Sequence, residues 1–142
     1  AAFDGATVLA RMEKRFDEYL THLDFTNGDY TFFFPPYSAL YWNYAFGAGN
    51  GETYLEFKAY AEARLLEYEN VRIFDFQNAP FITDLNNYKD YTHYAPEIND
   101  RMLGCFASGE YLVTEAASTE NLLGATQAQV AQLLERYPQI PE

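Results

Sequence analysis

An acidic and a basic side chain stand three residues apart in the tetrapeptide Asp90-Tyr91-Thr92-His93. In a catalytic triad, a carboxylate orients an imidazole and stabilises its protonated form, and the imidazole takes a proton from a nucleophile. The spacing is compatible with such a pair. Asp and His also fall three apart by chance in many proteins, where the histidine packs or caps a helix and the aspartate hydrogen-bonds within its own loop.

The surroundings of this pair favour the catalytic interpretation. The apolar run from Val71 to Phe76 predicts a strand, and Pro96 predicts the first turn of a helix. The pair lies in the loop between them, and open α/β sheets bind their ligands at the carboxyl ends of strands. We therefore expect Asp90 to be the acid and His93 the base of one site.

The elements around the site follow from hydrophobic periodicity. Apolar residues at spacings of three and four predict helices over about 6–20, 52–69, 96–108 and 120–137. Tyr30–Phe34 and Val71–Phe76 are apolar runs without alternation, typical of strands buried on both faces of a parallel sheet. Residues 37–51 are predicted to form a loop. The order indicates an α/β fold with right-handed crossovers, and residues 1–142 show no interdomain linker.

Two parallel strands are too few for an independent sheet. We therefore expect further strands from sequence outside these 142 residues or from a second copy of the chain. Until it is paired, the edge at Phe32-Phe33-Phe34 is a template for association.

The composition restricts the possible partners. The net charge is −12, which argues against a nucleic-acid partner because phosphate binding depends on clusters of Lys and Arg. Cys105 is the single cysteine, so no intrachain disulfide can form. No run approaches the roughly 18 apolar residues of a membrane span. The start at Ala1 lacks a Met and resembles a cut, so we expect that an anchoring segment has been lost.

Two segments resemble a known hydrolase family. The stretch from Asn86 to Tyr94, NNYKDYTHY, resembles the last conserved block of SGNH/GDSL-type hydrolases, in which the catalytic residues stand in Asp-x-x-His order. The stretch from Phe33 to Ser38, FFPPYS, is similar to the strand-end block of bacterial cell-envelope members of the teichoic-acid D-alanyl transfer type. The resemblance covers about residues 3–111.

This resemblance implies a flavodoxin-like, SGNH-type parallel three-layer α/β/α sandwich, of which the chain supplies the C-terminal two strands and their flanking helices. It implies Asp90 as the orienting acid and His93 as the general base, with Tyr37, Ser38 and Trp42 lining the substrate pocket. It further implies a serine esterase or acyltransferase acting on O-acyl groups of a cell-envelope polysaccharide, without metal or cofactor. The expected location is extracytoplasmic, with an anchor outside this chain, and a cytoplasmic location stays open.

The nucleophile of the family has no counterpart here, because no Gly-Asp-Ser-Leu block is present. The other possible nucleophiles have structural interpretations. Ser38 is predicted to lie in a loop, and Ser108 at the end of a helix. Ser118 is predicted to cap a helix, and Cys105 to lie in the core. We therefore expect the chain alone to be inactive. Its partner would be the missing N-terminal half or a second copy, with an acylated glycan as substrate.

Two other interpretations stay open. One is a non-catalytic glycan- or partner-binding module of degenerate SGNH type. Its aromatic belt, which otherwise belongs to the core, would stack on sugar rings; the belt consists of Tyr37, Tyr41, Trp42 and Tyr44. The other is a site for a hard metal ion formed by Asp75, Asp84, Asp90 and His93, although their spacing matches no known loop.

Overall fold

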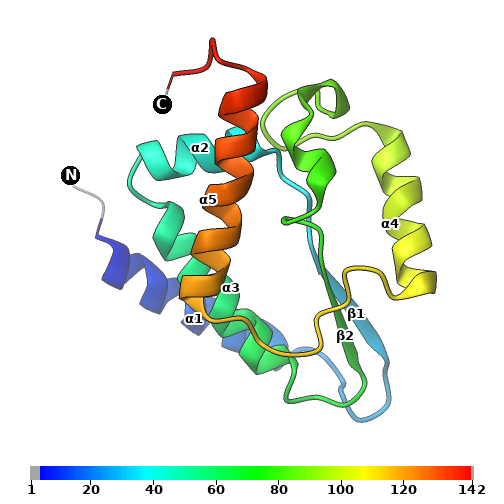
Figure 1. The fold of residues 1–142 in the computed structure, drawn as a ribbon. Coiled ribbons are helices and arrows are strands. Elements are labelled where there is room, and N and C mark those ends of the chain that lie inside the picture. The colour runs from blue at the N-terminus through cyan, green and yellow to red at the C-terminus, as the bar shows by residue number, and fades with distance from the viewer. Residues whose placement is uncertain (1–3, 142) are drawn as a thin grey trace.

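A computed structural model of the chain describes residues 4–141, and over this range it is a mixed α/β protein (Figure 1). Its elements are α1 (Gly5–Leu20), β1 (Tyr30–Phe34), α2 (Ala39–Gly47), α3 (Gly51–Leu65), β2 (Val71–Asp75), the 3-10 turns η1 (Pro80–Thr83) and η2 (Leu85–Asn87), α4 (Pro96–Ser108) and α5 (Thr119–Arg136). The predicted alternation of helices and strands is confirmed.

The two strands pair in parallel, as predicted, with Tyr30 opposite Val71 and Phe34 opposite Asp75. On its other side, β2 is bordered by the chain that follows α4, where Leu112 forms an antiparallel bridge with Phe74. The outer edge of β1 has no neighbouring strand within residues 4–141. β2 is therefore the central strand, and β1 is an edge.

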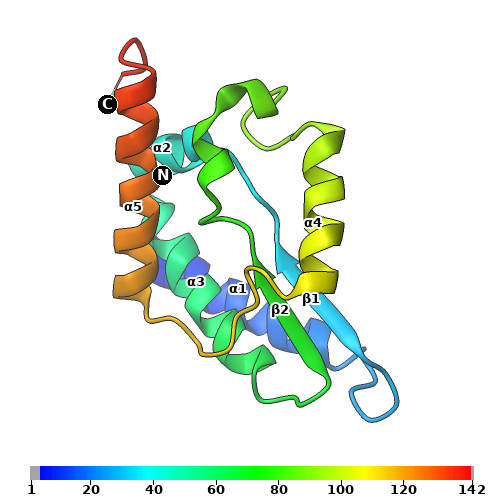
Figure 2. The ribbon, with the colours of Figure 1, turned by 45° about the vertical axis from the view of Figure 1, so that its right-hand side comes forward.

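Helices cover both faces of this small sheet. On one face, Leu20 of α1 and Leu65 of α3 pack against Ile73. On the other, the ring of Phe106 in α4 lies 5.0 Å from that of Phe74. Figure 2 shows α4 on the opposite side of the strands from α1 and α3. The described elements therefore form three layers.

The segment predicted to be a loop after Pro36 contains helix α2, so that prediction was wrong. The residues of α2 are almost all apolar or aromatic, and the helix therefore has no polar face that would reveal a helical period. Its start is marked instead by Ser38, whose hydroxyl caps the helix. Trp42 of α2 is buried with Leu55 of α3 and Leu122 of α5.

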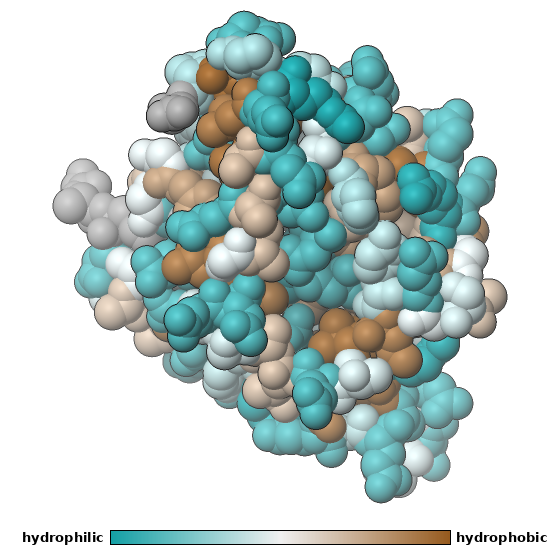
Figure 3. All heavy atoms as spheres, viewed as in Figure 1, coloured by the Kyte–Doolittle hydropathy of each residue, from teal (hydrophilic) through white to brown (hydrophobic). Residues whose placement is uncertain are grey.

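The face of the molecule seen in Figure 1 is mainly hydrophilic. Figure 3 shows that hydrophilic residues predominate on one face, with apolar residues in small patches between them. None of the helices in the described part of the chain is long and apolar enough to cross a membrane.

Candidate active site

The candidate catalytic residues lie on a tight loop between η2 and α4. Tyr88 and Tyr94 form an antiparallel bridge at the base of this loop, and the N–H of Lys89 donates to the carbonyl oxygen of His93 at 2.9 Å. The Tyr88 hydroxyl donates to the carbonyl oxygen of Pro36 at 2.6 Å. The loop is therefore closed on itself and attached to the segment that follows β1.

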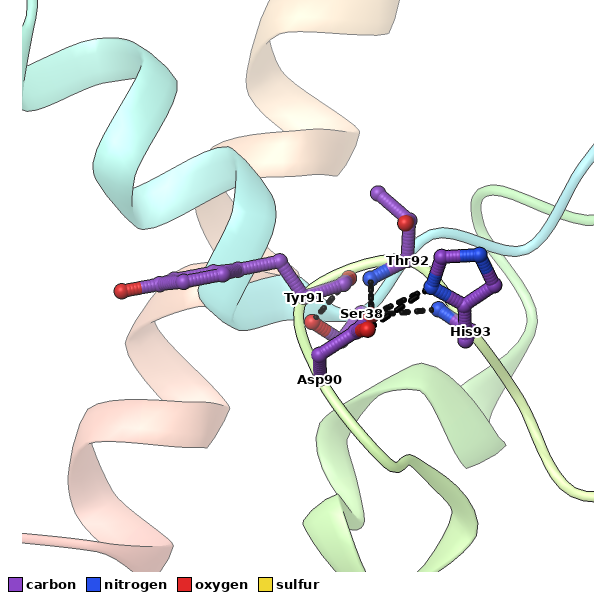
Figure 4. A network of polar contacts seen from close by, with 5 residues as sticks. All are labelled: Ser38, Asp90, Tyr91, Thr92 and His93. Carbon is purple, nitrogen blue, oxygen red and sulfur yellow. Dashed lines mark hydrogen bonds and ion pairs between the residues drawn. The ribbon is translucent and has the colours of Figure 1, made fainter.

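Asp90 and His93 are in direct contact at the tip of this loop (Figure 4). The Nδ1 atom of His93 lies 2.7 Å from Oδ2 and 2.9 Å from Oδ1 of Asp90. The same carboxylate accepts from the backbone N–H groups of Thr92 at 3.0 Å and His93 at 2.9 Å. These contacts fix the carboxylate against the imidazole.

The same contacts keep Asp90 charged. The backbone N–H of Thr92, the backbone N–H of His93 and then the imidazole lower the pKa of Asp90 to about 2. An ionised carboxylate beside Nδ1 favours the tautomer in which that nitrogen carries the proton. The second ring nitrogen of His93, Nε2, is then the proton acceptor.

Nε2 is accessible. The side chain of His93 is 76% exposed, and Figure 4 shows Nε2 directed away from the carboxylate. An open hollow of about 380 Å³ adjoins the ring, and Pro35, Tyr37 and Asn99 line its other walls. General-base catalysis requires a hydroxyl within hydrogen-bond reach of Nε2, and the exposed side of the ring leaves room for one.

Ser38 lies beneath the pair and is fully buried. Its hydroxyl donates to the carbonyl oxygen of Tyr91 at 2.7 Å and accepts from the N–H of Tyr41 at 3.3 Å. The hydroxyl therefore both donates and accepts a hydrogen bond within the fold. In this structure Ser38 supports the loop that carries the pair.

Tyr37 and Trp42 occupy different positions relative to the pair. Tyr37 lines the hollow beside His93 and also a second cavity on the other side of Pro35. Trp42 lines only this second cavity, which has a volume of about 310 Å³ and also borders Lys58. Of the three residues expected to bind substrate, the structure thus places Tyr37 beside His93, Trp42 in an adjoining cavity and Ser38 below the loop.

The interior holds a charged group that the sequence analysis missed. Lys58 is 3% exposed, and its Nζ lies 2.8 Å from Oδ2 of Asp75. Glu62, one turn further along α3, is 1% exposed and accepts from the N–H of Ala117 at 3.0 Å. Burial raises the pKa of Glu62 above its ordinary value. The sequence feature that could have indicated this buried charge is the position of Lys58, which lies next to Phe57 among the apolar residues of the helix.

The other possible nucleophiles lie elsewhere. The Ser118 hydroxyl caps α5, and the Ser108 hydroxyl accepts from the N–H of Glu110 at the end of α4. Cys105 lies on the buried face of α4, where burial raises the pKa of its thiol. None of these residues lines the hollow beside His93.

The four residues considered as a metal site do not share one. Asp75 pairs with Lys58, Asp84 caps η2, and Asp90 contacts His93. Within residues 4–141, no group of three or more His, Cys, Asp or Glu side chains could hold a metal ion.

Comparisons with known proteins give no assignment. No family model, no curated protein and no solved structure matches this chain.

Proposed function

We propose that Asp90 and His93 are the acid and base of an SGNH-like serine esterase or acyltransferase that acts on O-acyl groups of a cell-envelope polysaccharide. The observation that carries this proposal is the hydrogen-bonded pair itself, with Nδ1 held 2.7 Å from the carboxylate and the ring exposed beside a hollow. The contact with Asp90 orients the ring on one side, and the other side is open to an incoming hydroxyl.

The geometry supports a sequence of proton transfers. Nε2 of His93 takes the proton from a serine hydroxyl as its oxygen attacks the acyl carbonyl, and Asp90 stabilises the imidazolium that forms. The imidazolium then gives its proton to the sugar oxygen as the acyl C–O bond breaks. Water or an acceptor hydroxyl resolves the acyl-enzyme with His93 again as base.

The serine belongs to a part of the assembly outside residues 1–142. Ser38, the serine nearest the pair in the fold, uses its hydroxyl within the structure. The outer edge of β1, unpaired within residues 4–141, is where further strands of a flavodoxin-like sheet would join. The N-terminal half of the same protein or a second copy would supply them, and an anchor there would hold the assembly outside the cytoplasm.

A second candidate is a non-catalytic glycan-binding module. The observation that favours it is that no serine or cysteine lines the hollow beside His93, while aromatic rings line the adjoining cavity. In this alternative the Asp90–His93 pair only shapes the loop.

The test measures hydrolysis of an aryl acetate and release of acetate from an O-acetylated polysaccharide by the protein expressed from its complete reading frame. We expect His93→Ala to lower turnover by at least about 10²–10⁴-fold, the typical contribution of general acid–base catalysis. The matched control is His22→Ala, which removes the other histidine of the chain, just after α1. Equal turnover in wild type and His93→Ala, or no turnover in the complete protein, would overturn the esterase proposal and favour the binding module.

A further inference from the structure

Residues 109–118, the strap that joins α4 to α5, lie against the outer edge of β2, on the side away from β1 (Figure 2). The N–H of Val113 donates to the carbonyl oxygen of Ile73 at 2.8 Å, and the N–H of Asp75 donates to that of Tyr111 at 3.0 Å. Two hydrogen bonds, on either side of the bridge between Leu112 and Phe74, therefore pair the strap with β2.

The strap has the features of a segment that opens separately from the core. None of its residues is buried, and its two carboxylates, Glu110 and Glu115, are exposed. Tyr111 has a φ of 67°, in the left-handed region, which costs a residue other than glycine free energy. Segments with few buried contacts open at a smaller free-energy cost than the core.

The strap is also held near its C-terminal end, at Ala117. The N–H of Ala117 donates to Oε2 of Glu62 at 3.0 Å. Glu62 lies on α3 and is 1% exposed. One carboxyl group in the interior thus ties the strap to the helix beneath it.

The surroundings of Glu62 are unfavourable for a negative charge. The charged groups that act on it are Lys58, one turn earlier on α3, and Asp75 of β2. Lys58 is already paired with Asp75 at 2.8 Å, so an ionised Glu62 gives this buried group an uncompensated negative charge. Helices α2 and α5 pack against α3 through apolar side chains, and Asp17 of α1 is paired with Arg64.

We propose that the strap opens as Glu62 loses its proton, so that it is a pH-dependent cover for the outer edge of β2. Opening lets water reach the carboxylate. The released edge then presents the N–H of Asp75 and the carbonyl oxygen of Ile73 to another strand. None of the residues involved lines the hollow beside His93, so strap opening is independent of the proposed esterase function.

The direction of the pH dependence follows from the burial of Glu62. Burial raises the pKa of its carboxyl group above the ordinary value of 4.5, although the N–H of Ala117 and the charge of Lys58 act in the opposite direction. Because the closed strap has the higher pKa, closure is most favoured below 4.5. As the pH rises from 4.5 through the raised pKa, the open fraction increases by up to about tenfold per pH unit.

Hydrogen exchange of single amides, followed by NMR from about pH 4 to about pH 8, measures this opening. The amides of Asp75, Val113 and Ala117 report on the strap, and the amide of Ala61 in the middle of α3 reports on global unfolding. After division by the intrinsic exchange rate, we expect a larger open fraction at the three strap amides than at Ala61, rising with pH. Equal open fractions at all four amides would overturn the proposal, because the strap would then not open by itself.

Two variants assign the pH dependence to Glu62. Glu62→Gln removes the charge, while its amide oxygen can still accept from Ala117, and we expect the rise with pH to be lost. Glu115→Gln is the matched control, because it removes an exposed carboxylate from the strap and should keep the wild-type rise. An unchanged rise in Glu62→Gln would contradict the proposal.

A measurement on the wild type decides the question if Glu62→Gln fails to fold by circular dichroism. The ¹³C shift of the Glu62 carboxyl group should titrate with a midpoint above 4.5. A midpoint at or below 4.5 would overturn the proposal, since closure would then not weaken as the pH rises.

Discussion

The hydroxyl of Ser38 donates a hydrogen bond to the carbonyl oxygen of Tyr91 at 2.7 Å. One residue stands at the start of α2, and the other lies between Asp90 and His93 (Figure 4). The backbone N–H of Ser38 donates to the same carbonyl oxygen at 3.1 Å. The first turn of α2 therefore holds the loop that carries the candidate catalytic pair.

This relationship predicts the effect of Ser38→Ala. The variant loses the cap of α2 and one of the two bonds to Tyr91, so we expect the free energy of unfolding in urea to fall by about 1–2 kcal/mol. We also expect the His93 ring resonances to broaden, because the loop loses part of its support. The matched control, Ser118→Ala, removes the exposed cap of α5 and should leave those resonances unchanged. Sharp, unshifted His93 signals in Ser38→Ala would contradict the supporting role.

The charge of Asp90 can be followed by its carboxyl ¹³C shift. Hydrogen bonds to the carboxylate lower the pKa of Asp90 from 3.8 to about 2, so the titration midpoint should lie near that lower value. Because the folded pKa is the lower one, Asp90 stabilises the fold above its unfolded pKa. That contribution is lost as the pH falls from about 3.8 to about 2. Asp90→Asn should lack this acid-dependent part, and a midpoint close to 3.8 would show that the hydrogen bonds do not form in solution.

The buried ion pair predicts a large effect of Lys58→Met. The side chains of Lys58 and Asp75 are 4% and 12% exposed, and removing the ammonium leaves a carboxylate in the interior without its counter-charge. We expect the free energy of unfolding to fall by about 3–5 kcal/mol. The double variant Lys58→Met/Asp75→Asn removes both charges and should regain part of this loss. Equal stability of the single and double variants would mean that the pair is not coupled.

The open edge of β1 predicts self-association of residues 1–142. Tyr30 and Phe34 use their backbone groups toward β2, so the alternating pattern of a strand turns those of Thr31 and Phe33 outward. The side chain of Phe33 is 43% exposed. Phe33→Lys should weaken association by roughly tenfold in sedimentation velocity, because lysine on an edge opposes strand pairing.

The control for this edge is Tyr19→Lys, which replaces another exposed aromatic residue, on α1. It should leave the association unchanged. A chain that sediments as a stable monomer would remove the pairing proposal.

The strands and most helices could be predicted because their patterns are local. Tyr30–Phe34 has the same limits in the sequence prediction and in the structure, and α1 differs by one residue at its start. Helix α2 was missed because its buried and exposed residues are almost equally apolar, and only the cap at Ser38 marked it.

The candidate site also combines contacts that the sequence predicts with contacts that it does not. The contact between Asp90 and His93 follows from a spacing of three residues within one loop, so the sequence is sufficient to expect it. The pairing of Lys58 with Asp75 joins a helix to a strand, and the cavity that Lys58 borders needs residues from four segments. No local pattern predicts such a meeting, although a lysine among apolar helix positions marks a charge that must find a partner.

The parallel register of β1 and β2 also has a kinetic consequence. It joins residue 30 to residue 71, so the chain must close a long loop before the first ladder bond forms. The intervening α2 and α3 can form early from local contacts, and the sheet must wait for them to dock. We therefore expect assembly of the strands to be the slow step of folding and the stage at which the chain is most exposed to aggregation.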